Sequence, residues 1–388
     1  MAPMQQLPAG WLAEELLDGM LTDCDQVAGL WLTGLSLNSR DIRAGDLFFA
    51  CAGYRQHGLA FAGQAAAAGA VLVLAEPTAD WPVQRIHALA AELALPVISV
   101  PGLAAKVSAI AARYYAEPAS QMRVIGITGT NGKTSVSQYI ASALPEGWKC
   151  AVVGTTGNGF PGELQPATHT TPDAVSAQAL LADLLQAGAR SVAMEVSSHA
   201  LHQQRVNSVP FHTAVFTNLS RDHLDYHGSM QAYAEAKSRL FRQPGLELAV
   251  VNTDDALGWQ LAQELKGKIR LVACGRAHDT SARADEYIQI TGSGVAPRGL
   301  RISLDSSWGK GEIHSRLVGG FNAGNLVLVL GVLLGWDILL DEALQRLQQV
   351  YPVAGRMQCF GAGEQPLVVV DYAHTPDALE QALRAARE

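Results

Sequence analysis

The segment that most constrains this chain is a glycine-rich turn, Gly129-Thr130-Asn131-Gly132-Lys133-Thr134-Ser135. It follows the apolar run 124–127 and precedes residues 136–144, which are typical of a helix. Such a turn cradles phosphate, because small residues let backbone N–H groups face the anion and the helix N-terminus adds its dipole. Lys133 can reach the β- and γ-phosphates, and the Thr134 hydroxyl can bind Mg²⁺. The segment therefore predicts ATP or GTP binding.

The spacing differs from the common phosphate loop, which has a glycine five residues before the Gly-Lys pair, where this chain has Ile127. An ordinary strand-to-helix turn is the alternative interpretation. It would explain the glycines but not the Lys-Thr pair, so we prefer the interpretation of this turn as a nucleotide-binding site.

Composition limits the class of protein. A length of 388 residues predicts two or three domains. Only 16% of the residues are charged, so we expect a folded chain, and the net charge of -8 argues against a nucleic-acid partner. Five cysteines without a Cys-x-x-Cys pair indicate a reducing compartment, without disulfides or a zinc site.

The apolar segments of the chain bear on its location. Residues 1–10 lack a signal-peptide pattern, and the apolar run 326–334 is too short to span a bilayer. We therefore expect a soluble cytoplasmic protein that does not bind a membrane. No long apolar helix is patterned to pair with itself, so we expect a monomer.

Alternating strand and helix patterns predict an α/β protein with mostly parallel sheets. We expect an N-terminal domain at 1–115, a central domain with the phosphate loop at 116–354, and the start of a third domain at 355–388. Residues 287–317 read as antiparallel strands, and 321–334 as a buried helix. In the last segment, 367–371 reads as a buried strand and 376–388 as a helix. A lone strand and helix cannot bury both faces, so we expect this third domain to be cut short.

Polar residues follow several of the predicted strands. Glu195 ends the strand at 191–194, where the ligand crevice of an open parallel sheet lies, so its carboxylate can meet Mg²⁺. His223 lies in 217–228, a segment rich in charged and imidazole groups, and is a candidate second metal ligand. The alternatives are a capping glutamate and a capping loop. Lys237, taken alone, reads as a solvated helix lysine.

Further polar residues precede the buried helix and follow the last strand. Asn322 and Asn325 can cap the helix at 321–334 or touch a nucleotide base. Arg356, Asp371 and His374 again lie near strand ends, where they can close over ATP from the third domain.

Taken together, four motifs resemble the Mur ligases, and within that family the MurE branch, which adds the third amino acid of the peptide. They are the phosphate loop 129–134, Glu-Val-Ser-Ser-His at 195–199, Asn-Leu-Ser-Arg-Asp-His-Leu-Asp-Tyr-His-Gly at 218–228 and Asp-Tyr-Ala-His-Thr-Pro-Asp at 371–377. The match runs from about residue 37 to the end of the chain. Folylpolyglutamate synthases share the ATPase core but would not need the N-terminal domain.

The resemblance implies three domains, with a Rossmann-like C-terminal domain present only as its first strand and helix. It also implies that the N-terminal domain binds UDP-N-acetylmuramoyl-L-alanyl-D-glutamate. Asn38 stands where the family often has Asp, and His169 where we expect Asn. The implied substrate residues are Leu37, Ser39, Tyr54, Arg55 and Gln56 for the uridine diphosphate, and His169, Thr170, Thr171, Ser197, Gln203 and Arg205 for the muramoyl-dipeptide.

The implied reaction is ATP-dependent amide formation through an acyl phosphate, with meso-diaminopimelate, or alternatively L-lysine, as the third amino acid. This is a cytoplasmic step of peptidoglycan synthesis, on which cell shape and division depend. Residues choosing between the two amino acids are expected beyond Glu388. The implied ATP-binding residues are Gly129, Thr130, Asn131, Gly132, Lys133, Thr134, Ser135, Asn325, Arg356, Asp371 and His374.

The resemblance also implies two Mg²⁺ ions and reverses the interpretation of one lysine. Thr134 and Glu195 would hold the first ion. His223 and Lys237, carbamylated by CO₂, would hold the second. The implied catalytic residues are Lys133, Glu195, His223 and Lys237. Two alternatives remain: a fragment that binds nucleotide and UDP-substrate without ligation, and an unrelated phosphate-loop kinase with no affinity for UDP-sugars.

Overall fold

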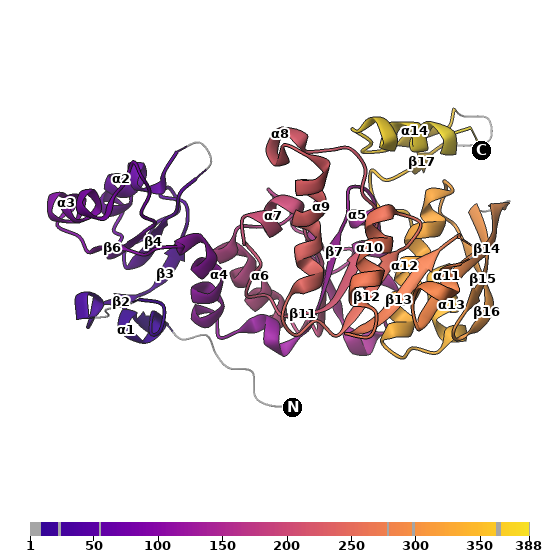
Figure 1. Ribbon diagram of the computed structural model, residues 1–388, viewed down its shortest axis with the longest axis horizontal. Helices are drawn as coiled ribbons and strands as arrows, with labels where there is room; N and C mark the ends of the chain where they lie inside the picture. Colours follow the sequence, from indigo (N-terminus) through magenta and orange to yellow (C-terminus); the bar gives the residue numbers. More distant parts are fainter. Residues whose placement is uncertain are drawn as a thin grey trace. The chain divides into compact units, whose positions relative to one another are not determined.

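The computed structural model describes residues 9–21, 25–53, 56–277, 279–296, 299–361 and 366–387. The chain forms two compact units, of which the first combines 1–121, 172–187 and 202–209 and the second combines 122–171, 188–201 and 210–388 (Figure 1). The expected α/β architecture is confirmed. The three-domain division stays a prediction.

The first unit is built on a four-stranded parallel sheet, and its strands alternate between two cores. Along β4, Leu47 and Phe49 face one core while Phe48 and Ala50 face the other, because successive strand residues point to opposite faces. Helix α6 (Ala174–Gln186) packs on α4 (Leu103–Tyr114). The sheet order is β3 (Gly34–Ser36), β4 (Asp46–Ala50), β5 (Leu72–Ala75) and β6 (Val97–Ser99).

Smaller elements complete the first unit. A short antiparallel pair precedes the sheet, and two further helices lie between its strands. These elements are β1 (Trp11–Leu12), α1 (Ala13–Leu16), β2 (Trp31–Leu32), α2 (Ala62–Ala67) and α3 (Val83–Leu93).

The second unit is organised around a ten-stranded sheet with the order β16-β15-β14-β13-β12-β11-β7-β10-β8-β9. From β14 to β8 in this spatial order, neighbouring strands are parallel. Strands β9, β15 and β16 pair antiparallel with their neighbours. After β7, the chain forms β8 and β10 on one side of this strand and then crosses to form β11 on its other side. Ligands bind at the carboxyl ends of strands beside such a switch in direction. The central strands are β7 (Arg123–Thr128), β8 (Cys150–Gly154), β10 (Ser191–Glu195), β11 (Phe211–Phe216), β12 (Leu248–Asn252) and β13 (Arg270–Gly275).

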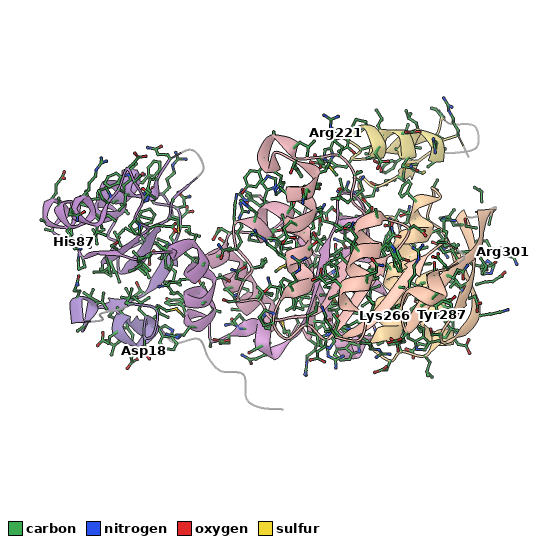
Figure 2. All side chains as sticks on the ribbon, viewed as in Figure 1. Asp18, His87, Arg221, Lys266, Tyr287 and Arg301 are labelled. Atoms are coloured by element: carbon green, nitrogen blue, oxygen red, sulfur yellow. The ribbon has the colours of Figure 1, made fainter. Side chains whose placement is uncertain are left out.

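The antiparallel edge of this sheet confirms the strands expected at 287–317. It consists of β14 (Glu286–Ala296), β15 (Gly299–Ser306) and β16 (Gly309–Ser315). Figure 2 shows Arg301 pointing outward there, where it pairs with Glu312 at 2.8 Å. On the other edge, β9 (Gly157–Gly159) forms a hairpin with β8.

Helix α12 (Phe321–Gly335) is the most deeply buried helix of the second unit. It packs on α5 (Lys133–Ala143), α13 (Leu340–Gln348) and strands β12 to β14. Helix α10 (Ala256–Leu265) packs on β12 as well. Among the described residues, no helix is both long and apolar enough to cross a membrane.

The C-terminal segment corrects one expectation. Strand β18 (Val368–Val370) pairs antiparallel with β17 (Gln358–Phe360), which the sequence reading missed because it is short and mixed in polarity. The expected burial of 367–371 is wrong, since Leu367 is 60% and Val368 52% exposed. An apolar run indicates burial only where a second layer covers it, and this strand belongs to a two-stranded hairpin. Helix α14 (Pro376–Ala385) follows as expected.

Candidate functional site

The phosphate loop connects β7 to α5 as the sequence predicts. Gly129 (φ 150°) and Gly132 (φ 85°) adopt backbone conformations that favour glycine. A Cβ atom on Gly129 would overlap the Thr217 hydroxyl, and one on Gly132 would lie 2.7 Å from Asn325 Oδ1. The first N–H groups of α5 have no partner within the helix, so the loop offers donors to an anion.

Lys133 is the first residue of α5 and turns back over this loop. Its Nζ donates to the carbonyl oxygens of Gly129 at 2.8 Å and Thr130 at 2.9 Å. Burial lowers the pKa of Lys133, and Arg356 lowers it further, whereas Glu195 opposes this shift. A phosphate anion beside the amine would favour the charged form.

Glu195 ends β10 and is fully buried, at the strand end where the sequence places it. Its carboxylate accepts hydrogen bonds from the Thr134 hydroxyl at 3.0 Å, the Thr155 N–H at 2.9 Å and the Thr155 hydroxyl at 3.1 Å. Burial raises the pKa of Glu195, while Lys133 opposes the shift. Arg356 Nη2 donates to the Thr134 hydroxyl at 3.0 Å. A hydroxyl beside a carboxylate is a hard oxygen donor set of the kind Mg²⁺ prefers.

Lys237 lies on α9 (Met230–Ser238) and is 1% exposed, so its reading as a solvated helix lysine is wrong. Its Nζ donates to Gly129 O at 2.7 Å and lies 4.4 Å from the centre of the Tyr233 ring. Burial lowers the pKa of Lys237 well below its ordinary value, and the charge on Lys133 adds to the effect. The environment therefore favours a neutral amine.

His223 precedes the short helix α8 (Leu224–His227) in a left-handed conformation with φ 52°. Its Nε2 lies 3.3 Å from Asp222 Oδ2, and its ring lies edge-on to His199 at 4.8 Å. Burial lowers the pKa of His223, while Asp222 opposes the shift. A neutral imidazole can bind a metal. Within the described ranges, no three His, Cys, Asp or Glu side chains gather as a ready metal cluster.

A cavity of about 690 Å³ collects most of the predicted nucleotide residues. It lies within the second unit, over the phosphate loop, the start of α12 and the C-terminal segment. Lys237 is not among its lining residues. The predicted residues that line it are Thr130, Asn131, Gly132, Lys133, Thr134, Ser135, Thr170, Glu195, His223, Asn325, Arg356, Asp371 and His374.

Predicted substrate residues of the second unit lie close to Glu195. The Thr171 hydroxyl donates to Glu195 O at 2.8 Å and accepts from Ser197 N at 3.0 Å. The Thr170 and Thr155 hydroxyls are 3.0 Å apart. His169 Nδ1 lies 3.1 Å from the Thr168 hydroxyl.

The remaining predicted substrate residues belong to the first unit. The buried Ser39 hydroxyl donates to Gln64 Oε1 at 3.0 Å, and Leu37 packs on the core of this unit. Gln56 is exposed, and Arg205 Nε donates to Gln203 Oε1 at 2.9 Å. Tyr54 and Arg55 lie outside the described residues.

The sequence reading missed several cavity residues that follow strands. Asn252 and Asp254 come at or after the end of β12, and Arg276 comes directly after β13. The strand-end rule that pointed to Glu195 would have found them. Thr217 and Asn218 follow β11 in the same way and line the cavity too.

Comparisons with known families decide the relationship of this chain. A family model described as the Mur ligase middle domain matches residues 127–333. A second, described as the Mur ligase family catalytic domain, matches residues 32–115. The chain belongs to the Mur ligase family. The resemblance found in the motifs is thereby confirmed.

Mur ligases of one kind recur among the similar proteins. UDP-N-acetylmuramoyl-L-alanyl-D-glutamate–2,6-diaminopimelate ligase of Alkalilimnicola ehrlichii is 49% identical over 371 residues, which cover 95% of this chain and 73% of the relative. The enzyme of that name from Ectopseudomonas mendocina is 50% identical over 361 residues, covering 93% and 72%. A solved structure of a ligase of the same name has a TM-score of 0.80 at 34% identity, and the match covers 97% of this chain and 74% of that one.

Proposed function

We propose that this Mur ligase uses ATP to join 2,6-diaminopimelate, in its meso form, to the D-glutamate carboxylate of UDP-N-acetylmuramoyl-L-alanyl-D-glutamate. The observation that carries the proposal is the phosphate loop, with Lys133 over it and the buried Glu195–Thr134 pair beside it. Relatives that are about half identical over nearly the whole chain bear the name of this reaction. The product would serve peptidoglycan synthesis in the cytoplasm.

The cavity suits ATP in both charge and shape. Its loop side offers helix N–H groups and Lys133 to the phosphates. Its lining also includes Ile290, Val327 and Leu328, apolar side chains that a purine base can contact. We assign nucleotide contacts to Asn325, Arg356, Asp371 and His374 as well, all of which line the same cavity.

The residues present also fit Mg²⁺. Thr134 and Glu195 would hold one ion, because a buried carboxylate with a raised pKa gains from a cation. His223 and a carbamate on Lys237 would hold a second. When bound, the ions neutralise phosphate charge during transfer.

The protein's part in the reaction is positioning and charge neutralisation. A carboxylate oxygen of the substrate attacks the γ-phosphorus of ATP, the bond to the β-phosphate oxygen breaks, and ADP leaves behind an acyl phosphate. Lys133 stabilises the charge of the transferred group from above the loop. The amine of diaminopimelate then attacks the acyl carbon, loses a proton, and inorganic phosphate leaves as the amide forms.

The environment of Lys237 supports the proposal that this lysine is carbamylated. A neutral amine attacks CO₂, forms an N–C bond and loses a proton, so the lowered pKa of Lys237 favours the reaction. We expect Lys237→Ala to be inactive and to recover partly with short-chain carboxylic acids. Protein equilibrated with ¹³C-bicarbonate should show a carbamate carbon signal that the variant lacks. Absence of both the signal and the rescue would contradict the carbamate.

Substrate binding involves Thr170 at the nucleotide cavity and further residues that do not line it. We assign the uridine diphosphate to Leu37, Ser39, Tyr54, Arg55 and Gln56 of the first unit. We assign the muramoyl-dipeptide to His169, Thr170, Thr171, Ser197, Gln203 and Arg205. The support is the resemblance of this chain to the family, together with the contacts of Thr171 and Ser197 beside Glu195.

Phosphate release from ATP tests the function. We expect release only when the UDP-linked dipeptide and meso-diaminopimelate are both present, and none from Lys133→Ala. L-lysine in place of diaminopimelate separates the two amino-acid choices. Phosphate transfer that does not require the UDP-linked dipeptide would contradict the ligase and favour a kinase.

A further inference from the structure

Residues 217–220 have no role in the reaction as described, although they run beside the phosphate loop. They follow β11, and Leu219 N donates to Asp255 Oδ2 at 2.7 Å, which anchors the segment to the start of α10. Ser220 N donates to the Thr130 hydroxyl at 3.0 Å, so the segment contacts the loop at a second point.

Asn218 makes the closest set of contacts with the loop backbone. Its side-chain Oδ1 accepts from Asn131 N at 3.0 Å, and its Nδ2 donates to Asn131 O at 3.1 Å. Its own carbonyl oxygen accepts from Thr130 N at 2.8 Å. A carboxamide carries the same donor and acceptor as a peptide group, so Asn218 pairs with the loop as a neighbouring strand would.

These bonds decide which loop groups can meet a phosphate. The N–H groups of Thr130 and Asn131 are both taken by Asn218, which leaves the donors from residue 132 onward to the anion. The Asn131 carbonyl is held from a second side by the Thr217 hydroxyl at 2.6 Å. Removing the side chain of Asn218 takes one partner from the N–H group and one from the carbonyl of Asn131, so the two peptide groups on either side of this residue are held less firmly.

We propose that Asn218 is a positioning residue for nucleotide binding, which acts by fixing the backbone N–H and carbonyl groups of Asn131 in the phosphate loop. The inference rests on the proposed function, because it assumes that ATP binds to this loop. Asparagine is specifically suited, since aspartate lacks the donor and would place a carboxylate against the Asn131 carbonyl. The anchor from Leu219 to Asp255 does not involve the Asn218 side chain, so the segment should stay folded in a variant.

The test compares Asn218→Ala and Asn218→Asp with the wild type by isothermal titration of Mg·ATP. Loss of the two side-chain bonds predicts roughly 10- to 100-fold weaker binding in both variants. In steady-state assays KM for ATP should rise, while KM for the UDP-linked dipeptide stays within about twofold. Asn207→Asp, at an exposed position of the first unit, is the matched control and should bind ATP as the wild type does.

The variants separate the competing explanations. Wild-type binding by Asn218→Ala overturns the proposal, and if only Asn218→Asp binds weakly, the effect is charge repulsion and the proposal is again overturned. Equal losses for ATP and the UDP-linked dipeptide, with a lower melting temperature, would show general damage instead of positioning. Failure of the wild type itself to bind ATP would overturn the proposed function, a result distinct from all of these.

Discussion

Replacing Glu195 with glutamine should leave the free protein as stable as before, or more stable, while weakening nucleotide binding. The carboxylate is fully buried and accepts hydrogen bonds from three donors, and Lys133 is the cation whose charge opposes the upward shift of its pKa. Its raised pKa, caused first by burial, means that the folded protein disfavours the charge. Removing a charge that the fold disfavours is neutral or stabilising.

The magnitude follows from the hydrogen bonds. Glutamine keeps an acceptor for Thr155 N, and the hydroxyls of Thr134 and Thr155 can turn to accept from its amide, because Thr155 also contacts Thr170. We expect a gain of 0 to about 2 kcal/mol, which corresponds to at most roughly 6 °C in melting temperature. Wild-type protein with Mg·ATP at a hundred times its Kd should gain about 2.7 kcal/mol from binding. A variant that binds tenfold more weakly would gain only about 1.4 kcal/mol at that concentration.

Thermal melting with and without Mg·ATP measures both effects together. Glu146→Gln makes the same chemical change at an exposed position of the second unit and should alter neither melting temperature nor ligand shift. The reasoning is refuted if Glu195→Gln melts several degrees lower than the wild type, or if it keeps the full shift with Mg·ATP.

Three further substitutions test other parts of the structure. Gly331→Ala should destabilise the protein by about 1–2 kcal/mol, because its Cβ would lie 2.7 Å from Val250 Cγ1 in the core. Gly324→Ala, on the same helix but with open space around it, should stabilise the protein by up to about 1 kcal/mol. Equal denaturation curves for the two variants would contradict the packing of α12. Burial and then Arg123 lower the pKa of His212, so the unfolded chain binds a proton before the folded protein does, and stability should fall as pH drops below about 6.5. His212→Gln should lose part of that fall between pH 7.5 and 5.5. An unchanged melting profile would count against a neutral imidazole in this partly buried site. Cys274 lines the cavity, but burial raises the pKa of its thiol, so brief alkylation at pH 7.5 should leave ATP binding intact. Rapid loss of ATP binding in the wild type but not in Cys274→Ala would refute the prediction that this thiol is unreactive.

Local sequence patterns were sufficient to place the phosphate loop and Glu195. A strand, a glycine-rich turn and a helix follow one another along the chain, so their geometry depends on nearby residues. Glu195 could be placed because the carboxyl ends of parallel strands share one edge of a sheet. The same rule predicts Asn252 and Asp254, which lie at and just after the carboxyl end of β12.

Burial was the property that sequence patterns predicted least well. Lys237 sits on a helix of mixed polarity, and only the tertiary packing that places it against Gly129 reveals that it is buried. For the strand expected at 367–371 the error is the opposite one: burial was predicted, but its apolar residues are exposed in a two-stranded hairpin. In both cases the layer that covers a side chain, or fails to, comes from residues distant in sequence.

The fate of one oxygen atom tests the central claim most directly. We would label the reacting D-glutamate carboxylate of the UDP-linked dipeptide with ¹⁸O and analyse the inorganic phosphate by mass spectrometry after turnover with ATP and meso-diaminopimelate. An acyl phosphate predicts one ¹⁸O atom in each phosphate released, because the attacking oxygen leaves with it. Amide product formed with unlabelled phosphate would contradict the account.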